Sequence, residues 1–190
     1  MLAQSFDKPW KHWIVDDFLD SDTLDEVKSI DHVVAQAKPG KRVDSVRLFI
    51  TDDHETQYPH LHHLYRSLHN GAYRTFFEYY TGIDYSDMFP RLEVISDIGD
   101  FWLEPHYDRP AKKLSALLYT NYTKLYPGTG LGDGTRVESK DNRCFFFVAG
   151  QHSLHDYPIV HFLQYVDVYK LTTGPIKTRP TKHTLSLIHI

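Results

Sequence analysis

A histidine and a carboxylate two positions apart constrain this chain more than any other feature. His106 and Asp108 stand in the polar segment 104–112. In an extended chain, side chains at positions i and i+2 leave the same face of the backbone. The two side chains are therefore predicted to point at one metal ion from neighbouring positions.

A third ligand has to come from a distant part of the chain, and His152 and His155 are the candidates. Two histidines and one carboxylate on one face of an ion are the ligand set of the non-haem Fe(II) oxygenases. A His-x-Asp triplet also arises by chance, and this chain has 13 histidines. The alternative interpretation is a strand end at the surface, where Asp108 forms a solvated ion pair with Arg109.

The segments around the pair favour the metal site. Residues 90–102 are predicted to form a strand and a turn that lead into the pair. Residues 113–121 have the composition of a buried strand, and a glycine-rich turn follows at 127–134. Another apolar strand is predicted at 144–148, directly before the two candidate histidines.

This order resembles that of the 2-oxoglutarate-dependent Fe(II) dioxygenases, in particular their small prolyl-4-hydroxylase-like branch. The matching segments are 105–110 (PHYDRP), 113–121 (KLSALLYTN), 142–147 (NRCFFF), 153–156 (SLHD) and 182–187 (KHTLSL). The resemblance covers about residues 90–190, and several blocks in one order are more specific than any single block.

The resemblance implies an Fe(II) centre held by His106, Asp108 and His155, with 2-oxoglutarate and O2 as co-substrates. His155 is preferred over His152 because the metal histidine of the family follows a serine by two positions. The implied reaction is hydroxylation of an unidentified substrate with release of succinate and CO2.

The far carboxylate of 2-oxoglutarate needs a fixed cation, because a buried carboxylate without a partner is very costly. The resemblance assigns this role to Lys182, with hydroxyl groups from Ser186 and Tyr119. Arg179 and His183 are the alternative donors.

The spacing before Lys182 departs from the family, because the lysine follows the distal histidine by 27 positions. Residues 157–181 are therefore expected to form an insertion, with a hairpin suggested by the alternating pattern at 162–169. Side chains near the ligands in sequence are candidates for a substrate pocket, and each is equally well explained by packing or surface exposure. They are Trp102, Tyr107, Arg109 and Arg143.

The N-terminal part of the chain is predicted to contain helices. A first helix begins with a capping box of Thr23 and Glu26, carries an apolar stripe to Ala37 and stops at residues 38–40. Strands are predicted before and after it, at 13–19 and 43–50.

A second helix begins near Pro59 and continues to Tyr80, with Gly71 as a kink or break. Its histidines lack a carboxylate or cysteine at matching spacing, so a solvent-facing position is favoured over a metal site. They are His60, His62, His63 and His69.

Helices followed by short strands indicate an α+β fold that is mainly β. The expected architecture is a jelly roll (double-stranded β-helix) buttressed by N-terminal helices. With 190 residues, we expect one domain, in which residues 1–87 support a metal-binding β core at 88–190.

Composition limits the partners and the location. A net charge of −4 without a basic stripe argues against a nucleic-acid partner. The single cysteine excludes an intrachain disulfide and fits the cytoplasm, and no apolar segment is long enough for a membrane span. A small-molecule or peptide substrate is expected, and the oligomeric state is open.

Two other functions remain possible from the residues. A cupin-like metalloenzyme uses a similar fold without 2-oxoglutarate, and would give Lys182 and Tyr119 no role. A non-catalytic jelly-roll binding module would leave the His-x-Asp pair and the distal histidine unexplained.

Overall fold

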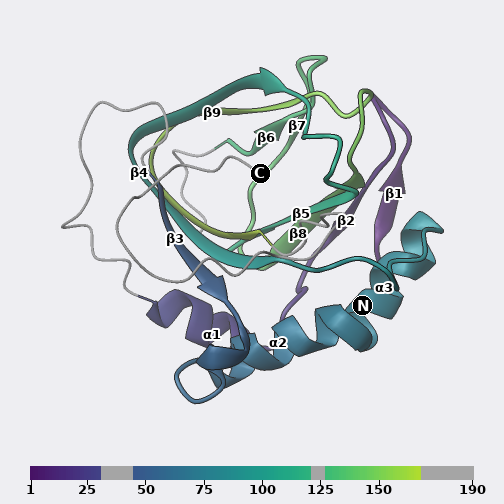
Figure 1. Cartoon of the computed structure of the whole chain (residues 1–190). Coiled ribbons are helices and arrows are strands. Elements are labelled where there is room, and N and C mark those ends of the chain that lie inside the picture. The colour runs from purple at the N-terminus through teal and green to yellow at the C-terminus, as the bar shows by residue number, and fades with distance from the viewer. Residues whose placement is uncertain (31–44, 121–126, 168–190) are drawn as a thin grey trace.

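The computed structural model describes residues 1–30, 45–120 and 127–167 and consists mostly of β-strands with three α-helices (Figure 1). The strands are β1 (Gln4–Phe6), β2 (His12–Val15), β3 (Ser45–Ile50), β4 (Leu92–His106), β5 (Leu114–Tyr119), β6 (Thr129–Gly130), β7 (Arg136–Val137), β8 (Arg143–Val148) and β9 (His155–Asp167). The helices are α1 (Ser21–Ser29), α2 (Pro59–Asn70) and α3 (Ala72–Thr81), and a 3-10 turn, η2, spans Asp52–His54. None of the described helices is long and apolar enough to cross a membrane. The mainly β composition with N-terminal helices is confirmed.

The strands form an antiparallel sheet in the order β1-β2-β8-β5-β9-β4-β3. The short strand β6 pairs with both β7 and β9. In Figure 1 the three helices lie along the lower side of the molecule, and β4 and β9 curve together from that side to the opposite one. The sheet therefore bends around an interior of its own, with the helices packed outside it.

Strand β8 separates two hydrophobic cores, because its side chains alternate and both faces are buried. Cys144 and Phe146 belong to the core shared with the helices, while Phe145 and Phe147 belong to the core inside the curved sheet. Each buried aromatic side chain contributes about 1.5–3 kcal/mol through the hydrophobic effect. The inner core is formed by Trp10, Ile95, Leu117, Tyr119, Leu131, Val137, Phe145, Phe147 and Tyr157.

Strand β4 is one long element, not the strand and turn predicted at 90–102. It pairs with β9 from Glu93 to His106, and its register shifts between Ile98 and Phe101, where β4 contains one extra residue. The predicted turn was wrong because a bulge absorbs that residue without ending the strand.

Residues 157–167 continue β9, so this part of the expected insertion is not a separate hairpin. Pairing with β4 and β5 keeps the segment extended. The rest of the expected insertion lies outside the described residues. So do four residues that the resemblance assigned to or near the co-substrate site: Arg179, Lys182, His183 and Ser186.

The predicted capping box of the first helix was wrong. Asp20 is the N-cap of α1, and its carboxylate accepts a hydrogen bond from the Thr23 amide at 2.8 Å. The Glu26 carboxylate instead accepts from the Leu61 amide at 2.6 Å and so caps α2. The helix ends at Ser29, and the remainder of the expected apolar stripe up to Ala37 falls mostly outside the described residues.

The predicted break at Gly71 is confirmed, because α2 ends before it and α3 begins after it. A β-carbon at Gly71 would lie 2.7 Å from the Ser67 hydroxyl oxygen. The chain can therefore turn between the two helices only because this position has no side chain.

Asn142 joins the start of β8 to the N-terminal region. Its side-chain amide donates to the Leu19 carbonyl, and its side-chain carbonyl accepts from the Leu19 amide, both at 2.8 Å. Its backbone has a φ of 57°, a conformation that asparagine tolerates better than most residues. Asn142 is buried, so loss of its side chain leaves the N–H and C=O groups of Leu19 without these partners.

We predict that Asn142→Ala lowers the free energy of unfolding by about 2–4 kcal/mol, since two buried backbone groups lose their partners. Urea denaturation measures this change. Asn142→Gly, which accepts the positive φ but lacks the amide, should lose most of the same stability, and the exposed Lys140→Ala should change it by less than about 0.5 kcal/mol. If Asn142→Gly unfolded at the same urea concentration as the wild type, the two hydrogen bonds would not contribute to stability as proposed.

Candidate metal centre

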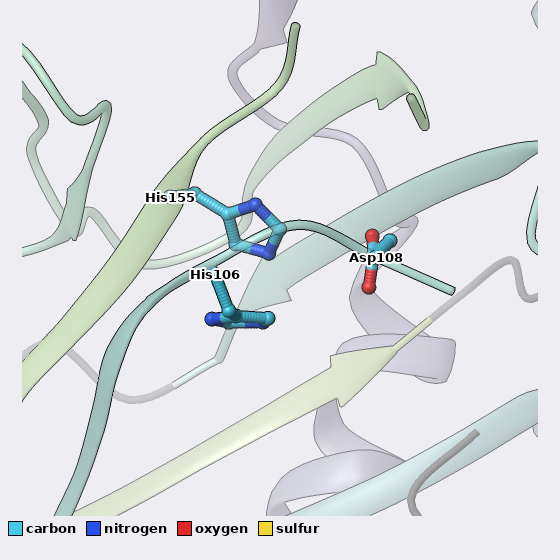
Figure 2. A group of neighbouring side chains, drawn as sticks. All are labelled: His106, Asp108 and His155. Carbon is cyan, nitrogen blue, oxygen red and sulfur yellow. The ribbon is translucent and has the colours of Figure 1, made fainter. Parts of the chain in front are cut away.

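Three side chains from two distant parts of the chain meet at one point. One ligand atom from each of His106, Asp108 and His155 lies within 4.8 Å of the other two. Figure 2 shows the two imidazole rings next to each other, with the Asp108 carboxylate beside them. Among the residues that the structure describes, this is the one such group of histidine, cysteine, aspartate and glutamate side chains.

The pairing of β4 with β9 creates this arrangement. His106, the last residue of β4, stands directly opposite His155, the first residue of β9. The centres of their rings are 4.3 Å apart. The ring of Phe147 on β8 packs against His155 at 5.0 Å and fixes it from the other side.

Both histidines are oriented by a backbone carbonyl group at Nδ1. Nδ1 of His106 lies 2.9 Å from the Glu104 carbonyl oxygen, and Nδ1 of His155 lies 2.8 Å from the Ser153 carbonyl oxygen. Because a carbonyl only accepts, each Nδ1 carries a proton, which leaves Nε2 as the nitrogen available to a metal. Burial lowers the pKa of His155 to about 4, so this ring is neutral at pH 7.

Asp108 is ionised and has partners on both oxygens. The Lys112 ammonium donates to Oδ1 at 2.6 Å, and the Ser115 hydroxyl donates to Oδ2 at 2.5 Å. Burial alone raises the pKa of Asp108, but the nearby Lys112, His155 and Ser115 together outweigh it and the pKa falls to about 2. The surface ion pair with Arg109 is therefore wrong, because Asp108 pairs with Lys112 and Arg109 is exposed.

The roles of Lys112 and Ser115 were not foreseen from the sequence. A lysine four positions after an aspartate is common on protein surfaces, so Lys112 gave no signal. Ser115 gave a weak one, because it is the hydroxyl residue in a strand whose six residues are all buried. A buried hydroxyl needs a hydrogen-bond partner, and here that partner is the Asp108 carboxylate.

The segment before His155 is held by the N-terminal region and by the glycine-rich turn. The indole of Trp10 donates to the carbonyl oxygens of Leu131 and Leu154, at 3.1 and 3.2 Å. Gly130 pairs with Asp156 in the sheet, and a β-carbon there would lie 2.3 Å from the Asp156 carboxylate. The Asp156 side chain fills the space beside Gly130, so a larger residue at this position would displace the Asp156 carboxylate.

Three of the residues predicted to line a substrate pocket have different positions in the structure. Tyr107 lies between His106 and Asp108 in the chain and is half-exposed. Trp102 lies four residues before His106 in β4. Arg143 donates to Asp16 at 2.7 Å, at the opposite end of β8 from Phe147. The structure therefore does not bring Arg143 to the metal ligands.

Tyr119 is fully buried inside the curved sheet, and its hydroxyl lies 2.6 Å from that of Thr129. Burial raises its pKa well above the ordinary value, so the phenol is protonated. Leu117 and Tyr119 belong to the inner core, and Ser115 lies at the alternate position before them on β5. One face of β5 thus leads from the metal carboxylate to Tyr119.

The other histidines considered as metal ligands lie away from this group. His152 is exposed and belongs to no described group of possible ligands. His62 on α2 lies 3.3 Å from the Asp52 carboxylate at the molecular surface.

No family model matches the chain, and no curated protein matches it. Solved structures are similar. The viral collagen prolyl hydroxylase of Paramecium bursaria Chlorella virus-1, solved with 2-oxoglutarate, aligns with a TM-score of 0.61 at 12% identity, over 85% of this chain and 96% of that one. A prolyl-4-hydroxylase of Pseudomonas putida aligns with a TM-score of 0.60 at 15% identity, over 86% and 93% of the two chains.

A prolyl hydroxylase of Trichoplax adhaerens, in complex with a hypoxia-inducible-factor peptide, also aligns, with a TM-score of 0.60 at 13% identity, over 85% of this chain and 83% of that one. The chain shares the overall fold of these prolyl hydroxylases. At the level of the fold, this confirms the resemblance first stated for residues 90–190. The donor set of two imidazoles and one carboxylate suits Fe(II).

We predict that His155→Ala weakens binding of Mn(II), a stand-in for Fe(II), at least about tenfold, because one of three ligands is lost. Isothermal titration calorimetry measures the affinity. His152→Ala and His62→Ala are the matched controls and should bind Mn(II) like the wild type. Loss of binding in His152→Ala with retention in His155→Ala would identify His152 as the third ligand instead.

Proposed function

We propose that this protein is an Fe(II)- and 2-oxoglutarate-dependent dioxygenase that hydroxylates a small molecule, an amino acid or a peptidyl residue. One observation carries the proposal: two histidines, each with Nδ1 held by a carbonyl group, and an ionised aspartate converge on one point. When bound, Fe(II) supplies the activation of O2, and 2-oxoglutarate is converted to succinate and CO2 as one oxygen atom enters the substrate.

The residues of this chain orient the ligands. The carbonyl groups of Glu104 and Ser153 hold the two imidazoles in the required tautomer. Ser115 and Lys112 fix the plane of the carboxylate. Preorganised ligands of this kind bind a metal more tightly than freely rotating ones.

We further propose that the curved sheet is a double-stranded β-helix. The antiparallel strand order, the long paired strands β4 and β9, and the core inside the sheet support this architecture. The ligands then lie at one end of the inner core, as expected for a jelly-roll enzyme that binds its substrates inside the fold.

The co-substrate is proposed to extend from the ligands into the inner core along β5. Tyr119 offers a protonated hydroxyl there, and Thr129 adds a second one. The buried carboxylate of 2-oxoglutarate also needs a cation, and Lys182 with Ser186 remains the proposed partner. Arg179 and His183 are the alternatives.

The likeness to prolyl hydroxylases supports a peptide or small-molecule substrate, since one of the similar structures contains a bound peptide. Tyr107 and Arg109 are exposed beside the ligands and are the proposed substrate contacts. The cytoplasmic location stays a prediction from the single cysteine. A cupin-like enzyme is less well supported, because the ligand set has one carboxylate and no His-x-His pair. A non-catalytic module is less well supported because it needs no ordered ligands.

We predict that the protein converts 2-oxoglutarate to succinate slowly without its substrate, because this side reaction needs only the iron, O2 and the bound co-substrate. Succinate is measured by mass spectrometry with Fe(II) and ascorbate, and His106→Ala is the control. Succinate no higher than in that control would favour the cupin-like enzyme or the binding module.

Lys182→Ala should raise the apparent KM for 2-oxoglutarate without changing metal affinity, because the lysine binds the end of the co-substrate away from the iron. Loss of such a charged contact costs about 2–5 kcal/mol, or roughly 30- to several-thousand-fold in affinity. Arg179→Ala and His183→Ala are the matched controls. A co-substrate defect in Arg179→Ala alone would move the cation site to Arg179.

A further inference from the structure

The carboxylate of Asp108 forms a buried ion pair beside its role as a metal ligand. Lys112 Nζ lies 2.6 Å from Oδ1, and both side chains are only 7% exposed. The pair is formed by two residues four positions apart, in the turn between β4 and β5. An ammonium group is therefore fixed next to the point where the three ligands meet.

Fold stability does not account for this lysine. The cost of removing two charges from water offsets most of their attraction, and a buried ion pair is often no more stabilising than apolar residues of the same size. Ser115 already holds the second oxygen of Asp108 without adding a charge. The charge of Lys112 therefore calls for a role in what the site binds.

We propose that Lys112 sets the charge of the metal centre, weakening the hold of Asp108 on a divalent cation and strengthening the binding of an anionic chelator. This inference rests on the proposed function, because the chelator is the 2-oxo acid. Lys112 acts through its ion pair with Asp108 and through the field of its charge, so it is a positioning residue and not a catalytic one.

The positive charge of Lys112 has opposite effects on metal affinity and on chelator affinity. A divalent cation with one aspartate and two neutral histidines has a net charge of +1, and Lys112 raises it to +2. The ammonium repels the incoming cation and competes with it for Asp108, so it lowers metal affinity. The same ammonium attracts the carboxylate that a 2-oxo acid adds to the metal, so it raises chelator affinity.

The test compares Lys112→Met with the wild type in two titrations at pH 8, where Asp108 stays ionised. Calorimetry measures the affinity for Ni(II), which does not react with O2, and then the affinity of the Ni(II)-loaded protein for 2-oxoglutarate. Lys112→Met should bind Ni(II) about tenfold more tightly, and 2-oxoglutarate about tenfold more weakly. Lys112→Arg, which keeps the charge, should restore both affinities toward wild type.

Lys113→Met is the matched control, since it removes the same charge one position away, and it should leave both affinities unchanged. Lys112→Gln replaces Lys112→Met if thermal denaturation shows that the methionine variant does not fold. A fall in both affinities, or no change in either, overturns the proposal, as does a Lys112→Arg variant that behaves like Lys112→Met. Absence of Ni(II) binding by the wild type would instead overturn the metal site and the proposed function.

Discussion

The antiparallel pairing of β4 with β9 is the constraint on which the rest of the structure depends. It sets His106 opposite His155, although the two residues are far apart in the chain. Because side chains alternate along a strand, a slip of one residue would turn one imidazole to the other face of the sheet. Asp108 follows His106 by two positions, so the same register also places the carboxylate.

Packing on both sides of β8 makes this register the stable one. Phe146 faces the helices and Phe147 faces the inner core, where it contacts His155. Trp10 lies against Phe147 at 4.9 Å and donates to the segment that leads into β9. The proposed ligands His106 and His155 therefore stand on paired strands backed by two cores, and Asp108 follows in the turn after β4. This arrangement limits how far the three side chains can move apart.

The sequence was sufficient for features that local patterns determine. The spacing of His106 and Asp108 predicted that both side chains belong to one group, and the apolar run before the distal histidine predicted β8. It was insufficient where tertiary contacts decide. Glu26 has a cap sequence for its own helix but caps α2, and the ion pair of Asp108 with Lys112 depends on a turn that no local pattern shows. Lys182 falls outside the described residues, so its role stays a prediction.

Anaerobic titration of the protein with Fe(II), with and without 2-oxoglutarate, tests the central claim most directly. If His106, Asp108 and His155 hold the iron and leave positions free for the co-substrate, adding 2-oxoglutarate should produce the visible charge-transfer absorption of its Fe(II) chelate. The band should be absent from His155→Ala and present in His152→Ala. A band of wild-type strength in His155→Ala, or none in the wild type at saturating Fe(II) and 2-oxoglutarate, would contradict this account.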